Sequence, residues 1–253
     1  MEHPKNRFKA ALKRGERQIG FWNTIPDPSV VEALATLSFD WLLIDTEHSP
    51  MEGSAILPLL QAAAPYPVTC LVRAGWNDPV EIKKILDCGA QGVLVPYVQN
   101  AEEAAAAVAA TRYPPKGIRG VAGATRASRF GAVADYVAKA DDEICVLIQA
   151  ETAEALSHIE AMAAVEGVDG IFIGPADLAA SMGHPGNPGH PDVRAAIMDG
   201  IMRIRAAGKP AGILSFDQSV LRDAADAGAQ FIALGLDIAL LRRAALELRS
   251  DWD

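Results

Sequence analysis

The chain has 253 residues, of which 50% are hydrophobic and 22% are charged, and this composition excludes a disordered or fibrous protein. Lysine and arginine number 23 against 32 aspartate and glutamate, and the formal net charge of −9 argues against a nucleic-acid partner. No apolar signal region follows the basic N-terminus, and no run reaches the roughly 18 apolar residues of a membrane span, so we expect a cytoplasmic protein without membrane contact.

Eight short apolar runs recur along the chain, each followed by a Gly, Pro, Asp or Asn break and then by a longer helical pattern. The runs are almost continuously hydrophobic rather than alternating, which is typical of parallel strands covered on both faces. In chain order the predicted strands are Ile19–Trp22, Trp41–Ile44, Val68–Val72, Gly92–Val95, Ile144–Ile148, Gly170–Ile173, Ala211–Leu214 and Phe231–Leu234.

Helical patterns lie between these strands, and a short helical extension at about residues 5–17 precedes the first of them. Several helices open with a capping residue and proline, as at Asp27-Pro28, and several end at glycine, as at Gly208. In chain order the predicted helices include Ser29–Leu37, Pro79–Asp87, Ala101–Thr111, Ala153–Ala163, Val193–Ala207, Ser219–Ala227 and Ala239–Leu248.

Strict alternation of strand and helix leaves two α/β architectures, a closed (β/α)8 barrel or an open doubly wound sheet. Eight units in 253 residues favour a TIM barrel that spans residues 1–253 as a single domain. An open sheet with a dinucleotide site lacks support, because no GxGxxG motif follows the first strand. The longest irregular segment, Tyr113–Ala132, lies between the fourth and fifth strands, and irregular loops of this length are usually functional.

Two carboxylates follow neighbouring strands, Glu151 after the fifth and Asp177 after the sixth. Barrel enzymes place their sites at the carboxyl ends of the strands, so we expect both carboxylates in one mouth. Hard oxygen ligands suit Mg²⁺ or Mn²⁺ better than Zn²⁺. The peptide N–H groups of Ala176 and Asp177 open a helical stretch and could hold a substrate carboxylate. The alternative is that each acidic residue only caps the helix that follows it.

A histidine and an arginine accompany these carboxylates at the predicted strand ends. Asp45 lies three residues before His48, close enough in a turn to accept its imidazole N–H, and such a pair fixes the tautomer of a general base. The alternative is a loop histidine held by a turn aspartate. Arg73 closes the third strand, where it either binds an anion or forms a salt bridge with Asp45 or Glu47.

Other chemistry finds less support in the sequence. His184 and His190, in the loop MGHPGNPGHPD, are interpreted as turn residues rather than as metal ligands. No lysine occupies the carboxyl end of a predicted strand, which disfavours Schiff-base chemistry, and there is no GxSxG elbow. The residues at this rim therefore predict a site that binds a small anionic ketone beside a metal ion.

An ordered set of segments covers nearly the whole chain from Gly20 to about Leu241. The segments are LLIDTEHSP, LVRAGWND, GVLVPYVQNAEEA, GIRGVAGATRASRFG, LIQAET, IFIGPADLAASMGHPGNPGHPDV and the strand GIL before Ser215. Together they resemble the HpcH/HpaI family of metal-dependent 2-keto-acid aldolases, which act on 4-hydroxy-2-oxoheptanedioate or on 2-keto-3-deoxy-sugar acids.

The resemblance implies a TIM-like barrel that cleaves 4-hydroxy-2-keto acids to pyruvate and an aldehyde and runs the reverse aldol addition. It implies a role in aromatic or sugar-acid catabolism, a divalent cofactor (Mg²⁺, Mn²⁺ or Co²⁺), and small molecules as the partners. It also implies a homo-oligomer, commonly a hexamer of domain-swapped dimers.

Roles for the central residues follow from the same motifs. Glu151 and Asp177 match the metal ligands of the family. His48 with Asp45 matches the base dyad, and Arg73 matches the residue that steadies the enolate oxygen.

The resemblance extends to residues around the substrate. Gln149 matches a neighbour of the pyruvate site, and Trp22 resembles an aromatic that packs near the substrate. Three arginines of the long loop, Arg119, Arg126 and Arg129, either reach the aldehyde half of the substrate, across a subunit interface for instance, or are solvated loop charges.

Two other functions stay open. A lyase or decarboxylase acting on a related keto acid or acyl-CoA ester would share the metal and enolate chemistry. A non-catalytic ligand-binding barrel is a different class, and it predicts that at least one of the central residues is missing. The sequence contains all of them: His48, Arg73, Glu151 and Asp177.

Overall fold

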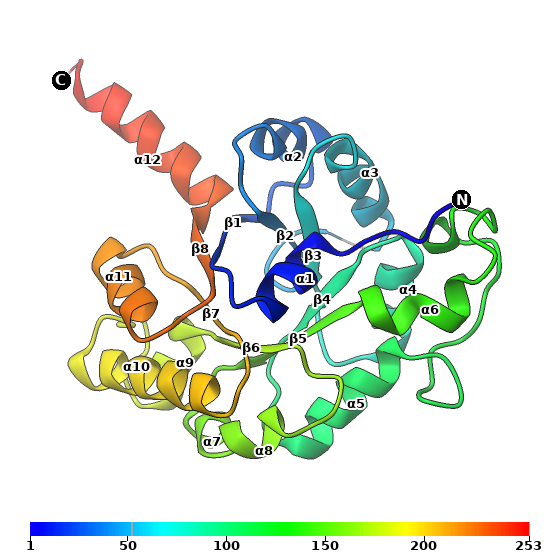
Figure 1. Cartoon of the computed structure of the whole chain (residues 1–253). Helices are drawn as coiled ribbons and strands as arrows, with labels where there is room; N and C mark the ends of the chain where they lie inside the picture. Colours follow the sequence, from blue (N-terminus) through cyan, green and yellow to red (C-terminus); the bar gives the residue numbers. More distant parts are fainter. Residues whose placement is uncertain (52, 253) are drawn as a thin grey trace.

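The computed structural model describes residues 1–51 and 53–252, and their strands close into one parallel barrel in sequence order (Figure 1). Each strand pairs with the next, and the last pairs with the first. The predicted TIM barrel is confirmed and the open sheet is excluded. The strands are β1 (Gln18–Asn23), β2 (Trp41–Asp45), β3 (Thr69–Arg73), β4 (Gly92–Val95), β5 (Cys145–Ala150), β6 (Gly170–Ile173), β7 (Ala211–Leu214) and β8 (Phe231–Leu236).

Helices follow the strands and cover most of the outer face of the barrel (Figure 1). The predicted helix over residues 153–163 is divided in two. A helix that the sequence did not indicate, α3, contains Pro58, and an internal proline normally predicts a break. The helices are α1 (Arg7–Lys13), α2 (Pro28–Ala35), α3 (Gly53–Ala63), α4 (Pro79–Asp87), α5 (Ala101–Thr111), the 3₁₀ helix η1 (Arg126–Ser128), α6 (Tyr136–Glu143), α7 (Ala153–Ser157), α8 (Ile159–Ala163), α9 (Pro175–Ser181), α10 (Pro191–Ala206), α11 (Gln218–Asp226) and α12 (Asp237–Ser250).

Large aromatic side chains fill the interior of the barrel. Facing glycines make room for them: a Cβ at Gly20 would lie 2.1 Å from the ring of Trp41, and one at Gly212 would lie 2.1 Å from the ring of Phe231. Phe8 of α1 packs on Trp41 and Phe231, with ring centroids 5.8 and 5.9 Å away. The helical extension therefore closes the amino end of the barrel and leaves the carboxyl end as the open mouth.

The C-terminal helix α12 projects away from the barrel instead of lying against it (Figure 1). Its large apolar side chains are exposed, because no other element of the described chain covers them. The exposed residues are Ile238, Leu240, Leu241, Leu246 and Leu248. Among the described residues, no helix is both long and apolar enough to cross a membrane.

Five strands, β1, β2, β3, β5 and β8, run further than their hydrophobic patterns predict. The bounds of β4, β6 and β7 match the sequence prediction, but β2, β3 and β5 each continue into polar residues. Asp45 ends β2, Arg73 ends β3 and Gln149 lies inside β5. The strand register, rather than a flexible loop, therefore holds these three side chains.

Candidate active site

Polar side chains form the layer directly above the apolar filling of the barrel. Side chains of a strand alternate between its two faces, so residues two positions apart point the same way. On β2, β3 and β5, an inward-facing leucine is followed two residues later by a polar residue at the mouth. These pairs are Leu43 and Asp45, Leu71 and Arg73, and Leu147 and Gln149.

Asp45 and Arg73 form a buried ion pair across β2 and β3. The strand register places the two residues opposite each other, and they are 1% and 7% exposed. Arg73 Nε lies 2.9 Å from Asp45 Oδ1 and Nη2 lies 2.5 Å from Oδ2, while Nη1 lies 2.8 Å from Glu47 Oε2. Burial would raise the pKa of Asp45, but Arg73 and the N–H groups of Trp22 and Glu47 hold it below its ordinary value.

The predicted contact between Asp45 and the imidazole of His48 is wrong. Asp45 Oδ1 accepts the backbone N–H groups of Glu47 at 3.0 Å and of His48 at 3.3 Å, and Arg73 engages both carboxylate oxygens. The His48 side chain is 66% exposed, with Nε2 3.9 Å from Glu47 Oε1. Glu47 is therefore the acid that faces the His48 ring, and the carboxylate of Asp45 pairs with Arg73.

Glu151 is a buried carboxylate at the centre of the mouth, with only 1% of its surface exposed. Its Oε1 accepts the backbone N–H of Tyr97 at 2.8 Å, and its Oε2 accepts the side-chain amide of Gln149. Burial first, and then the charges of Asp177 and Glu47, raise the pKa of Glu151 to about 7 against the lowering effect of its two hydrogen bonds. The mouth therefore concentrates negative charge around a carboxyl group that is poorly solvated.

Asp177 lies in the first turn of α9, directly after β6, and its side chain is exposed. Its charge acts on Glu151 and on Glu47, whose pKa is raised first by burial. The two predicted metal ligands thus face the same mouth. The N–H groups of Ala176 and Asp177 are among those that no carbonyl of the helix can accept.

Two residues that follow predicted strands, and to which the sequence analysis gave no role, shape the surroundings of Glu151. The β5/β6 register continues to place Gly174 beside Glu151, where a Cβ would lie 2.4 Å from Glu151 Oε2 and 2.8 Å from Gln149 Nε2. Tyr97 has a φ of 54°, an uncommon conformation outside glycine, and it directs its N–H at Glu151. Nothing in the residue type of Tyr97 signals this conformation, whereas a glycine after a strand is a weak signal of close packing.

Two of the loop arginines are structural. Arg119 is 1% exposed; its Nη2 lies 2.7 Å from Asp87 Oδ1, and its guanidinium lies 4.5 Å from the ring centre of Tyr113. Arg126 donates to the carbonyl of Cys88 at 2.8 Å. Within this chain, Arg119 is therefore neither a solvated charge nor free to reach a substrate, and both arginines attach the long loop to the carboxyl end of α4.

Comparison with known proteins agrees with this geometry. Residues 18–244 match the HpcH/HpaI aldolase/citrate lyase family. The chain belongs to this family. The HpcH/HpaI assignment made from the sequence motifs is confirmed, and so is the enzyme class, a carbon–carbon lyase.

Several members of the HpcH/HpaI family are similar to this chain over most of its length. It is 60% identical over 252 residues to the hydroxypyruvate/pyruvate aldolase of Sagittula stellata, with 100% of both chains covered. It is 54% identical over 242 residues to the 4-hydroxy-2-oxo-heptane-1,7-dioate aldolase of Salmonella paratyphi B, covering 95% of this chain and 92% of that one. A solved structure of an HpcH/HpaI aldolase/citrate lyase family protein from Burkholderia cenocepacia has a TM-score of 0.94 and 37% identity, covering 98% of this chain and 99% of that chain.

Proposed function

We propose that this chain is a divalent-metal-dependent aldolase that cleaves 4-hydroxy-2-keto acids to pyruvate and an aldehyde and catalyses the reverse addition. The observation that carries the proposal is the buried carboxylate Glu151, whose pKa is raised to about 7 in a mouth shared with Asp177 and Arg73. Relatives named as pyruvate aldolase and 4-hydroxy-2-oxo-heptane-1,7-dioate aldolase support this substrate class.

The donor set of the mouth fits a divalent cation. Glu151 and Asp177 would hold it, and their oxygen ligands favour Mg²⁺ or Mn²⁺, with Co²⁺ as a further candidate. The charges of Asp177 and Glu47 raise the pKa of Glu151, and the charge of Asp177 also raises the pKa of Glu47. The cationic Arg73 is already engaged by Asp45 and Glu47, so a bound cation would relieve the excess negative charge. When bound, such an ion supplies Lewis-acid polarisation of the substrate's keto oxygen.

Arg73 is placed to bind the oxygen that becomes negatively charged when the carbon–carbon bond breaks. Its guanidinium has five N–H donors, and Asp45 and Glu47 engage three of its nitrogens with one contact each, which leaves two N–H groups for the substrate. Trp22 is 2% exposed and lies beneath Arg73, with the guanidinium 5.2 Å from its ring centre. Trp22 therefore acts by supporting Arg73 rather than by an open contact with substrate.

Two further groups complete the substrate-binding half of the proposal. Gln149 donates its amide N–H to Glu151, while its buried Oε1 has no hydrogen-bond partner among the described residues and can accept one from the substrate. The N–H groups of Ala176 and Asp177 would bind the substrate carboxylate, because unpaired N–H groups at the start of a helix attract anions.

His48 is the proposed general base, and imidazole is the commonest side chain in that role. In cleavage it would accept the proton of the C4 hydroxyl group, with Glu47 orienting the ring. Replacing His48 with alanine is expected to lower turnover by roughly 10²–10⁴-fold and to leave metal affinity unchanged, because the ring is not a proposed ligand. Stopped-flow or steady-state release of pyruvate measures this, with His3→Ala as the control; near-normal turnover in His48→Ala would refute the assignment.

The proposed function is tested by measuring pyruvate release from a panel of 4-hydroxy-2-keto acids, before and after removal of metal with EDTA. We expect activity on at least one member, loss on chelation, and recovery on adding Mg²⁺ or Mn²⁺. Full activity after chelation would overturn the metal dependence. Turnover confined to oxaloacetate or to acyl-CoA esters would instead identify the decarboxylase or acyl-CoA alternative.

We also propose a homo-oligomer in which α12 packs against a second copy of the chain; the hexameric form comes from the sequence resemblance. The exposed leucines of α12 support this contact. Replacing Leu241 and Leu248 with lysine should lower the sedimenting mass of the protein, with Lys139→Ala as a surface control. An unchanged mass would exclude α12 from the interface. The cytoplasmic location stays a prediction from the sequence.

A further inference from the structure

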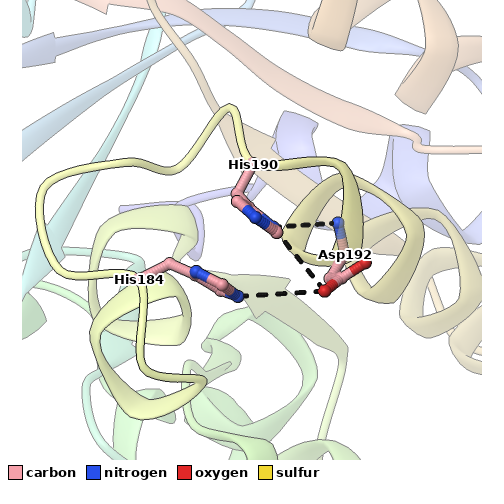
Figure 2. A group of neighbouring side chains, drawn as sticks. All are labelled: His184, His190 and Asp192. Atoms are coloured by element: carbon pink, nitrogen blue, oxygen red, sulfur yellow. Dashed lines mark hydrogen bonds and ion pairs between the residues drawn. The ribbon is translucent and has the colours of Figure 1, made fainter.

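Two histidines from the loop that joins α9 to α10 meet one aspartate in the first turn of α10 (Figure 2). The rings of His184 and His190 are stacked, with centroids 3.5 Å apart and planes inclined by 14°. Both rings present a nitrogen to Asp192: its Oδ2 lies 3.9 Å from His184 Nε2 and 3.7 Å from His190 Nδ1. One ligand atom from each residue lies within 4.8 Å of the other two.

We propose that His184, His190 and Asp192 bind a second divalent metal ion, of the kind that prefers imidazole ligands, with Zn²⁺ as the best match. Tetrahedral Zn²⁺ has bonds of about 2.0–2.1 Å to nitrogen and oxygen, which places its ligand atoms about 3.4 Å apart. The observed separations of 3.7 and 3.9 Å exceed this by only a few tenths of an ångström. The rings are stacked nearly parallel, so they would have to turn out of the stack before a lone pair of each points at one ion, with the fourth position left to water.

The backbone of this loop holds the ligands in place before an ion arrives. The N–H of His184 donates to the carbonyl of Ala179 at 2.8 Å, and the N–H of Asn187 donates to the carbonyl of His184 at 3.0 Å. The N–H of His190 donates in turn to the carbonyl of Asn187 at 3.1 Å. Both rings are about 70% covered, so the metal would bind to partly ordered side chains, which lowers the entropic cost of binding.

The ring nitrogens that face Asp192 are weakly engaged. His184 makes no side-chain hydrogen bond within residues 1–51 and 53–252. His190 Nδ1 accepts the backbone N–H of Asp192 at 3.2 Å, at the long end of the range for such bonds. An ion would replace this one hydrogen bond and would lie between the two ring nitrogens and the carboxylate of Asp192, which now face each other at 3.7–3.9 Å.

The ligand chemistry distinguishes this loop site from the mouth of the barrel. Two imidazoles and one carboxylate favour Zn²⁺ or Co²⁺, whereas the mouth offers carboxylates, which suit Mg²⁺ or Mn²⁺. The loop site joins the end of α9 to the start of α10, and α9 carries Asp177 in its first turn. Its expected effect is therefore to stabilise this part of the fold.

The test separates the two sites by first disabling the mouth. In the full chain carrying Glu151→Gln and Asp177→Asn, we expect Co²⁺ to bind with one equivalent and to give the visible absorption of a tetrahedral ion, which Zn²⁺ abolishes. Adding His184→Asn or His190→Asn should weaken Zn²⁺ binding by more than about 10-fold. Loss of a residue that only hydrogen-bonds a metal ligand already costs about 10-fold or more, and here a ligand itself is lost. His3→Asn, which removes a histidine elsewhere, should bind as the parent does.

A second readout uses the chain with its mouth intact. Zn²⁺ should raise the melting temperature of this protein, and the rise should be smaller in His184→Asn and in Asp192→Asn, which keeps the size of the side chain. Circular dichroism of each variant shows whether it has folded. In the chain with the disabled mouth, equal Zn²⁺ binding with and without His184 and His190, or binding of Mg²⁺ with the same affinity as Zn²⁺, would overturn the proposal.

Discussion

Replacing Glu151 with glutamine is expected to abolish metal-dependent pyruvate release while keeping the barrel folded. The substitution keeps the size of the side chain but removes the charge that would bind the cation. Loss of partners outside the ligand shell typically costs 10–100-fold in affinity or activity, so loss of a ligand should exceed about 100-fold. Calorimetric titration of Mn²⁺ and the pyruvate assay measure the two effects. Glu154→Gln, an exposed carboxylate three residues along the chain, is the control.

The raised pKa of Glu151 gives this prediction a pH dependence. A metal ion must displace the proton, so below pH 7 the apparent affinity for Mn²⁺ should fall by up to about 10-fold per pH unit. Titrations at pH 6 and pH 8 measure the change. An affinity that stayed flat between these values would show that Glu151 is not the ligand that titrates.

The raised pKa of Glu151 also affects the stability of the metal-free protein. The pH dependence is opposite to that of a salt-bridged acid, whose pKa is lowered on folding. The pKa of Glu151 rises from 4.5 to about 7 on folding, so the folded state binds more protons than the unfolded state between these values. Stability is therefore lost as the pH rises from about 4.5 to 7, by up to about 3 kcal/mol. Glu151→Gln lacks this loss, so with EDTA present it should be more stable than the parent at pH 8 and similar at pH 4. Urea unfolding at both values tests this, and equal stability at pH 8 would contradict it.

Much of the architecture could be predicted because its signals are local. The bounds of β4, β6 and β7 follow directly from short apolar runs between turn residues, and strand order follows from alternation with helices. The path of α12 could not be predicted in this way. An amphipathic pattern shows that a helix has an apolar face but not whether this chain or another covers that face.

The candidate site shows the same division between local and long-range information. Position after a strand identified Asp45, Arg73, Glu151 and Asp177, because the ends of parallel strands meet at one rim. Their partners depended on strand register, which no short segment encodes. Asp45 lies three residues from His48 but opposite Arg73 in the barrel, and the register determines which contact forms.

Replacing Arg73 with lysine is expected to lower kcat by about 10²–10³-fold, the typical cost of losing a donor that stabilises a developing oxyanion. A lysine keeps the positive charge but offers one nitrogen, which cannot engage Asp45 and Glu47 and also bind the substrate. Replacement with alanine should also destabilise the fold by about 3–5 kcal/mol, since it leaves Asp45 buried and unpaired. Steady-state kinetics and urea unfolding measure the two effects, with Arg203→Lys on the surface as the control.

The pH dependence of Arg73→Ala tests the cause of this destabilisation. Arg73 keeps the folded-state pKa of Asp45 below its unfolded value, so the pair stabilises the protein above pH 3.8 and loses that contribution as the pH falls through the folded pKa. The difference in unfolding free energy between the parent and Arg73→Ala should therefore become smaller as the pH falls below 3.8. A difference that does not change with pH would show that Arg73→Ala destabilises the fold through lost packing instead of through the lost ion pair.

Asp45→Asn separates the two roles available to this aspartate. If Asp45 acts by holding Arg73, the variant should lower kcat without moving the pH profile of turnover, because the charge of Arg73 persists while its position loosens. If Asp45 instead acted on the imidazole of His48 during turnover, the limb of the pH profile that belongs to the base would shift. The buried contacts of Asp45 with Arg73 and Trp22 predict the first result, and Glu47→Gln, which faces the His48 ring, should produce the shift that Asp45→Asn does not.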